Sequence, residues 1–137
     1  MGVLQQLRAR YGDKLRVVWR DFPHTLPESP KAAEAGQCAY DQGKFWEYHA
    51  LLYDRAPALS LGDLEGYATQ VGLDAAKFKT CLESGQDKAK VEHNLQDALD
   101  RHLPGTPAFL VNNQAVIGPQ SFEYFKNLMD SLLAAGG

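Results

Sequence analysis

Two cysteines are the first candidates for chemistry in this chain of 137 residues. Cys38 and Cys81 stand far apart, and the sequence contains no Cys-x-x-Cys motif. Redox catalysis needs a thiolate that is stabilised by basic neighbours or by a helix N-terminus. Both cysteines are flanked instead by largely apolar, helix-forming residues. We therefore expect no redox catalysis from this pair, and the residues leave open whether they form two buried thiols or one disulfide.

Histidines and aromatic residues are the next candidates, for metal binding and base stacking. The spacings of the four histidines match no helical or zinc-ribbon ligand pattern; they are His24, His49, His93 and His102. Phe45, Trp46 and Tyr48 cluster in the sequence, but a formal net charge of -3 argues against a partner that carries phosphates. We therefore predict no metal site, no cofactor and no nucleic-acid partner.

A proline-rich loop is the third candidate. Pro104-Gly105-Thr106-Pro107 directly precedes the apolar residues Ala108-Phe109-Leu110-Val111. Only about 5–6% of X-Pro bonds in folded proteins are cis. Taken alone, the residues therefore favour an ordinary turn with trans prolyl bonds before a strand.

Three segments have the composition of β-strands. Residues 15–19 are β-branched and aromatic, as are residues 108–111 and 114–117. Asn112-Asn113 suits a tight hairpin turn between the last two segments, because Asn tolerates positive φ. We expect these three strands to form the sheet that positions the loop.

Apolar residues at helical spacing predict the remaining elements. A helix over residues 3–11 precedes the first strand, and a loop with three prolines follows over residues 21–30. Further helices are expected from Ser29, as N-cap, to about Gln42, and over residues 45–55, 60–72, 74–85, 86–101 and 121–132. In the helix over residues 86–101, the spacing of Val91, Leu95 and Leu99 predicts a buried stripe.

Three of these segments together resemble the DsbA-like family of thioredoxin-fold proteins. Residues 11–23 resemble the segment after the family's active-site helix. Residues 32–49, with Gln42-Gly43-Lys44-Phe45-Trp46, are similar to its inserted helical domain, and Gly105-Thr106-Pro107 resembles its cis-proline loop. The resemblance implies an α/β thioredoxin-like fold over residues 1–137 as a single domain. Residues 1–23 and 103–137 would form the thioredoxin-like part, with a helical insertion over residues 29–102.

The resemblance also implies a function, which is formation or exchange of protein disulfides. Its partners would be extended peptides or protein thiols, which Thr106 and a cis Pro107 would position by their backbone. Cys38 and Cys81 would form a structural disulfide, closing a loop of about 44 residues that stabilises the fold by roughly 4 kcal/mol. Members of the family usually work in the periplasm or outside the cytoplasm.

The chain departs from the family in one respect. Members begin with a strand that leads into Cys-x-x-Cys, whereas residues 1–11 contain neither Cys nor Ser. We therefore assign no catalytic cysteine and expect this chain to be inactive in disulfide exchange. A non-redox peptide-binding module that uses the cis-proline groove is the alternative. A glutathione-handling enzyme is a weaker one, because it would need a Ser or Cys at the start of the first helix.

The missing strand would lie in the middle of the sheet. Either residues 15–19 pair directly with residues 108–111, or another chain fills the gap. We expect an N-terminally truncated product whose exposed sheet edges favour a homo-oligomer. No apolar run approaches the ~20 residues that span a bilayer, and residues 1–11 do not resemble a signal peptide, so no membrane insertion is expected. The cell compartment is left unassigned.

Overall fold

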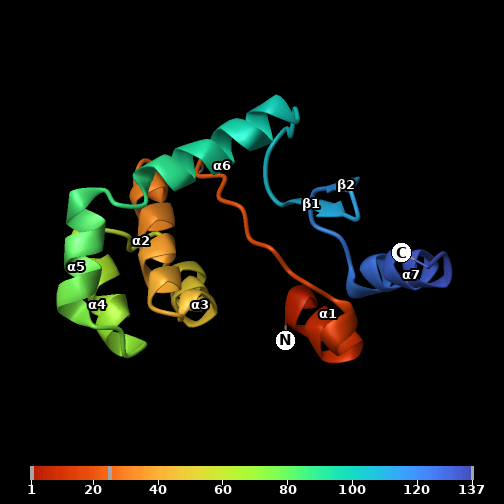
Figure 1. Cartoon of the computed structure of the whole chain (residues 1–137), viewed down its shortest axis with the longest axis horizontal. Coiled ribbons are helices and arrows are strands. Elements are labelled where there is room, and N and C mark those ends of the chain that lie inside the picture. Colours follow the sequence, from red (N-terminus) through yellow and green to blue (C-terminus); the bar gives the residue numbers. More distant parts are fainter. Residues whose placement is uncertain (1, 25, 137) are drawn as a thin grey trace. The chain divides into compact units, whose positions relative to one another are not determined.

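The chain folds into two compact units (Figure 1). The structure is a computed structural model and describes residues 2–24 and 26–136. The helical unit contains residues 20–98, and the sheet unit contains residues 1–19 and 99–137. Thr25, in the predicted loop over residues 21–30, lies outside the described residues.

Local sequence signals determine where the helices of the helical unit begin and end. These helices are α2 (Ser29–Asp41), α3 (Phe45–Arg55), α4 (Leu61–Gln70), α5 (Ala75–Ser84) and most of α6 (Lys88–Asp100). Ser60 and Asp63 form a reciprocal capping box at the start of α4, and the Asp74 side chain accepts a hydrogen bond from the Lys77 N–H at the start of α5. The helix α5 ends at Gly85, which adopts the left-handed conformation with φ +69°. The predicted N-cap of α2 is wrong: Glu28 takes that position, and the Ser29 hydroxyl accepts the Leu26 N–H instead.

The core of the helical unit lies between α2, α3, α4 and α5. Its largest fully buried side chains are Tyr48, Phe78, Leu64, Leu82 and Cys38. The Tyr48 and Phe78 rings lie 5.4 Å apart, and the Tyr48 hydroxyl donates a 2.9 Å hydrogen bond to the Leu64 carbonyl. A disulfide between Cys38 of α2 and Cys81 of α5 crosses this core, which confirms the predicted pairing.

A buried polar cluster joins α6 to the start of the unit. Asp21 accepts hydrogen bonds from Gln37 Nε2 at 2.8 Å and from Asn94 Nδ2 at 3.1 Å. Arg20 donates to Asn94 Oδ1 at 3.1 Å. Because burial without partners is costly, these bonds allow Asn94 to lie in the interior.

The polar cluster also explains which face of α6 is buried. The buried residues are Val91, Asn94 and Ala98, whereas Leu99 is 50% exposed. The predicted stripe is therefore right at Val91, only partly right at Leu95, which is half-buried, and wrong at Leu99. The buried face of the helix therefore lies about one residue position away from the face that apolar spacing predicts. The hydrogen bonds of Asn94 explain this difference.

In the sheet unit, two helices pack with a β-hairpin. Its elements are α1 (Val3–Tyr11), a 3₁₀ turn at Gly12–Lys14, β1 (Ala108–Val111), β2 (Gln114–Ile117) and α7 (Phe122–Ala134). Leu7, Tyr11, Val116 and Phe125 form the buried core. The Tyr11 hydroxyl donates to Asp130 Oδ1 at 2.7 Å, which ties α1 to α7.

The third predicted strand does not form. In the part of the chain that the structure describes, the sheet contains only β1 and β2, which are antiparallel with Val111 opposite Gln114. Residues 15–19 belong to no strand, so of the two expected alternatives their direct pairing with residues 108–111 does not occur. A strand needs a partner for its backbone groups, and Leu15 packs against the core of the sheet unit instead.

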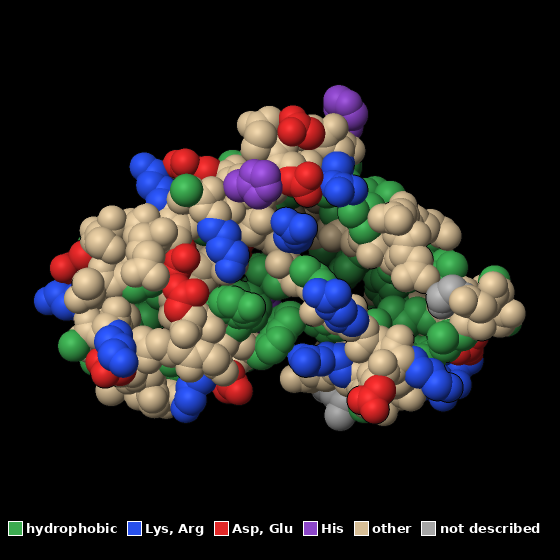
Figure 2. All heavy atoms as spheres, viewed as in Figure 1, with side chains coloured by type: hydrophobic (Ala, Val, Ile, Leu, Met, Phe, Trp, Pro, Cys, Tyr) green, Lys and Arg blue, Asp and Glu red, His purple; other side chains and the backbone are tan. Residues whose placement is uncertain are grey.

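The surface of the helical unit carries both signs of charge. Figure 2 shows Lys and Arg side chains interspersed with Asp and Glu over its helices on one face of the molecule. On the face shown, this mixture leaves no continuous basic groove of the kind that a phosphate backbone requires. None of the helices described has the length and hydrophobicity needed to cross a membrane.

Reducing the disulfide should destabilise the helical unit. The two cysteines are 43 positions apart, so chain entropy predicts a loss of about 4 kcal/mol in the free energy of unfolding. Chemical unfolding with and without dithiothreitol measures this loss. The matched control is the double variant Cys38→Ala/Cys81→Ala, whose unfolding should not respond to the reductant. Equal stability of the oxidised and reduced wild-type protein would contradict the prediction.

Two substitutions at Tyr48 should separate the hydrogen bond from the packing. Tyr48→Phe removes only the bond to the Leu64 carbonyl, which should cost about 1 kcal/mol in the free energy of unfolding. Tyr48→Ala also leaves a cavity in the core, for which about 3–5 kcal/mol is expected. Urea unfolding of both variants tests this order, and a larger loss for the Phe variant would refute it.

Candidate functional site

The two predicted binding residues lie in the loop before β1. Thr106 and Pro107 are joined by a cis peptide bond in the sheet unit. The Pro107 carbonyl accepts the Gly118 N–H at 2.8 Å, which extends the ladder between β1 and β2 by one position. This bond fixes which backbone groups of the following strand point toward β2.

The outer edge of β1 presents backbone groups to a partner. In an antiparallel ladder the pairs alternate between hydrogen-bonded and non-hydrogen-bonded positions. Since Pro107 bonds to Gly118, the groups of Phe109 and Val111 face β2, and those of Ala108 and Leu110 face away. Among the described residues no strand pairs with that edge, and the Leu110 side chain is 43% exposed. The arrangement can bind an extended peptide by strand addition.

The two cysteines lie in the other unit, and both are buried. Cys38 is 1% exposed and Cys81 is 7% exposed. A hollow of about 460 Å³ opens beside them, lined in part by Asp41, Gln42 and Gln86. Attack by a thiolate requires access to a disulfide sulfur, so this burial hinders exchange with the thiol of another protein.

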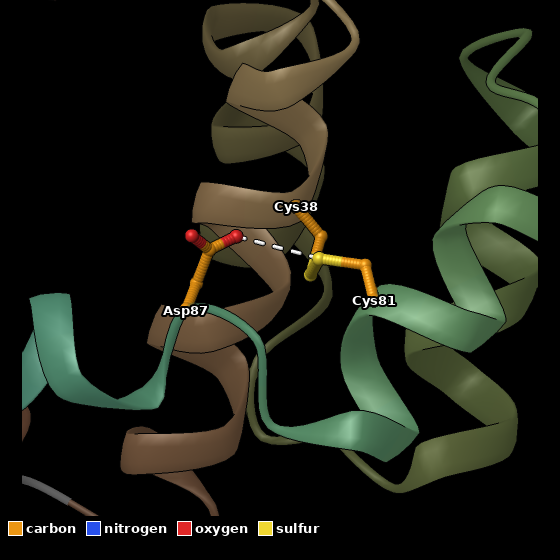
Figure 3. Close-up of side chains that lie close together, drawn as sticks. All are labelled: Cys38, Cys81 and Asp87. Carbon is orange, nitrogen blue, oxygen red and sulfur yellow. Dashed lines mark hydrogen bonds between the residues drawn. A yellow bond between two sulfur atoms is a disulfide. The ribbon is translucent and has the colours of Figure 1, made fainter.

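Two carboxylates of the helical unit approach the same sulfur. Asp87 Oδ2 lies 3.3 Å from Cys81 Sγ, and Asp41 Oδ2 lies 3.9 Å from it. In Figure 3, the Asp87 side chain points from the segment between α5 and α6 toward the disulfide. Because a disulfide sulfur carries no proton, the shorter contact is a hydrogen bond only when the Asp87 carboxyl is the donor.

The surroundings of Asp87 favour its protonated form. The residue is 9% exposed. Burial, together with the hydrogen bond and the negative charge of Asp41, raises the pKa of Asp87 to about 6, and the opposing effect of Lys90 is smaller. The carboxyl therefore keeps its proton under mildly acidic conditions, in which it can donate to Cys81 Sγ.

The histidines do not join these groups. Among the described residues, the cluster of metal-ligating types comprises Cys38, Cys81 and Asp87. His49 instead stacks on Phe45 with ring centroids 5.4 Å apart, and burial lowers the pKa of His49. The predicted aromatic group therefore belongs to the packing of α3.

The two carboxylates beside the disulfide were not predicted from the sequence. Asp41 follows Cys38 by one helical turn, a spacing that places both on one face of α2. That signal was present but is too common to stand out. Asp87 has no such signal, because its approach to Cys81 depends on how the chain turns at Gly85 after α5.

Comparisons with known proteins support the predicted fold. A profile of the family described as Thioredoxin matches residues 2–131. A thioredoxin-like oxidoreductase from Silicibacter pomeroyi DSS-3 is similar with a TM-score of 0.82 and 22% identity, over 96% of this chain and 78% of that chain. The thiol-disulfide exchange protein alpha-DsbA2 from Wolbachia pipientis has a TM-score of 0.84 and 20% identity, over 95% and 71%. At these identities the similarity concerns the fold.

Curated relatives match over only part of their own length. The Na(+)/H(+) antiporter NhaA of Herminiimonas arsenicoxydans is 38% identical over 117 residues, which cover 85% of this chain and 19% of the antiporter. The antiporter NhaA 1 of Salinispora arenicola (strain CNS-205) is 34% identical over 122 residues, with coverages of 88% and 19%. The chain thus spans about a fifth of the length of these relatives.

The family profile covers almost all of the chain, and the two solved structures share its fold. The predicted family and fold class are therefore confirmed. The chain belongs to the thioredoxin family and has a DsbA-like thioredoxin fold.

Proposed function

We propose that this chain is a DsbA-like domain of the thiol-disulfide exchange type that binds extended substrate peptides, and that the 137 residues do not exchange thiols by themselves. The observation that carries the proposal is the outer edge of β1. There the backbone of Ala108 and Leu110 faces away from β2, directly after the Thr106-Pro107 loop.

Docking at this edge would use the ordinary chemistry of strand pairing. An extended peptide would bond to the N–H and C=O groups of Ala108 and Leu110, as an added strand does in other sheets. The exposed Leu110 side chain offers apolar contact beside those groups. Backbone bonding is tolerant of sequence, which suits a domain that acts on many protein thiols.

The cysteines support the second half of the proposal. Both belong to a buried disulfide in the helical unit, and the sequence contains no other cysteines. A thiol-disulfide exchange reaction starts with a thiolate that can reach a sulfur of its partner. Cys38 and Cys81 meet neither condition in the oxidised chain.

The alternative is a non-redox module that binds peptides at the same edge. The two functions differ in whether a thiol of the bound peptide takes part in a reaction. The curated relatives do not lead us to propose ion antiport, because the matched region is only 19% of the two antiporters described above.

A second copy of the chain is a competing occupant of the β1 edge. Exposed strand edges favour self-association, so homo-oligomers would complete the sheet in the same way as a peptide. Light scattering over a range of protein concentrations separates the two cases, because only self-association raises the measured mass.

We expect the chain to be inactive in the reduction of insulin by dithiothreitol. The rate of insulin precipitation with the chain present should equal the rate with dithiothreitol alone. The double variant Cys38→Ala/Cys81→Ala is the matched control and should give the same rate. A rate above background that is lost in this variant would show that the cysteines are catalytic.

Proline at the outer edge of β1 should weaken peptide binding, whereas proline at the opposite edge of the hairpin should not. Leu110→Pro removes an N–H that faces away from β2, so it should weaken binding of an unstructured peptide without breaking the hairpin. Ala115→Pro is the matched control, because Ala115 lies opposite Leu110 and its N–H faces the other edge of the hairpin. Titrations followed by ¹⁵N NMR measure both affinities.

The peptide for this titration should be tested with its cysteine blocked as a thioether and with serine in its place. Equal affinities are expected, because the backbone carries the binding. Equal losses for Leu110→Pro and Ala115→Pro would overturn docking at the β1 edge. Shift changes confined to the helical unit would do so as well.

A further inference from the structure

We propose that the helical unit, once its disulfide is reduced, binds a thiophilic divalent cation such as Zn²⁺ through Cys38, Cys81 and Asp87, with Asp41 as the fourth ligand. The site is independent of the peptide-docking edge, which belongs to the other unit. The inference therefore goes beyond the proposed function and does not rest on it.

The two carboxylate oxygens lie at distances from Cys81 Sγ that suit a tetrahedral zinc site. Zn–S bonds of about 2.3 Å and Zn–O bonds of about 2.0 Å at tetrahedral angles place sulfur and oxygen roughly 3.5 Å apart. Asp87 Oδ2 and Asp41 Oδ2 lie 3.3 Å and 3.9 Å from Cys81 Sγ, on either side of that value. Asp87 already lies in one cluster with both cysteines, whereas Asp41 is exposed and must move toward the other ligands to complete the site.

The sulfur side of the site is also favourable. Two thiolates on one zinc lie roughly 3.8 Å apart. The Cα atoms of Cys38 and Cys81 are 5.9 Å apart, so both side chains already point into the same space. Once the S–S bond is broken, rotation of the cysteine side chains can open the sulfurs to that separation.

Rigid elements hold the four residues. Cys38 and Asp41 lie one turn apart on α2, Cys81 lies on α5, and Asp87 lies directly before α6. Cys38, Cys81 and Asp87 are all buried, and their ligand atoms lie within 4.8 Å of one another. Gln86 Nε2 donates to Asp41 Oδ2 at 3.4 Å, which orients this carboxylate from outside the ligand set.

The ligand chemistry selects the type of cation. Two thiolates favour zinc and other soft or borderline ions, whereas magnesium and calcium need sites built of oxygen atoms alone. The hollow of about 460 Å³ that both cysteines line gives an ion a route from solvent. The nearby cation Lys90 is held over the Tyr40 ring at 4.5 Å.

The oxidation state of the cysteines would control binding. A disulfide sulfur has no negative charge to offer, so the oxidised protein lacks two of its four ligands. A dithiol reductant supplies two electrons and two protons, which convert the disulfide to two thiols while the reductant becomes a disulfide. Zn²⁺ then displaces the two thiol protons on binding.

Cobalt titration of the full chain tests the site directly. The protein is reduced with a phosphine, freed of reductant without oxygen, and titrated with Co²⁺. We expect thiolate-to-cobalt charge-transfer absorption that saturates at one ion per chain and disappears when Zn²⁺ is added. The oxidised wild-type protein, which has the same sequence and fold, should show no such absorption.

A substitution then tests whether Asp87 is a ligand. Asp87→Asn should weaken Zn²⁺ binding by more than about tenfold, since even an outer-sphere partner contributes 10- to 100-fold. Glu83→Gln is the matched control. It also removes one negative charge, but from an exposed residue of α5 that pairs with Lys79. It should leave the affinity unchanged.

Three results would overturn the proposal. One is a reduced wild-type protein that circular dichroism shows to be folded but that gives no charge-transfer absorption with Co²⁺. Another is the same absorption from the oxidised protein, which would place the ion elsewhere. The third is equal affinity for Zn²⁺ in Asp87→Asn and Glu83→Gln, with circular dichroism showing both variants folded.

Discussion

The link between α2 and α5 is the constraint on which the helical unit depends. The Cys38–Cys81 bond joins α2 to α5. The core that this bond crosses also contains Phe78 and Leu82 of α5, which are fully buried. A cross-link over 43 positions removes much of the disorder available to the unfolded chain. The short helices α3 and α4 then need only to complete the core around Tyr48. In this way a unit made of short helices can be stable without a sheet of its own.

How much could be predicted from the sequence differs between local and non-local features. The helix expected over residues 60–72, which the capping box of Ser60 and Asp63 begins, and the Asn112-Asn113 turn were predicted, because each depends on residues close together in the chain. Residues 15–19 have strand composition but no strand partner among the described residues. Composition favours extended backbone, and only a neighbouring strand makes it part of a sheet.

The buried face of α6 shows the same limit in a helix. Apolar spacing favoured Leu95 and Leu99, whereas a carboxylate far away in the sequence draws Asn94 into the interior. The approach of Asp87 to Cys81 depends in the same way on tertiary structure. Of the candidate sites, the paired cysteines and the Thr106-Pro107 loop were accessible through family resemblance. The carboxylates around the disulfide were not, because no spacing in the sequence relates them to both cysteines.

The position of Asp87 has an energetic consequence that bears on why it is there. Its pKa is about 6 in the folded chain, above the ordinary value of 3.8. Between these pH values the folded state binds more protons than the unfolded state, so stability falls as pH rises through this window and remains lower at neutral pH. An apolar residue at position 87 would avoid that loss. A buried carboxylate beside a disulfide is therefore a poor choice for stability alone, but it is a suitable ligand for a cation that the reduced sulfurs would share.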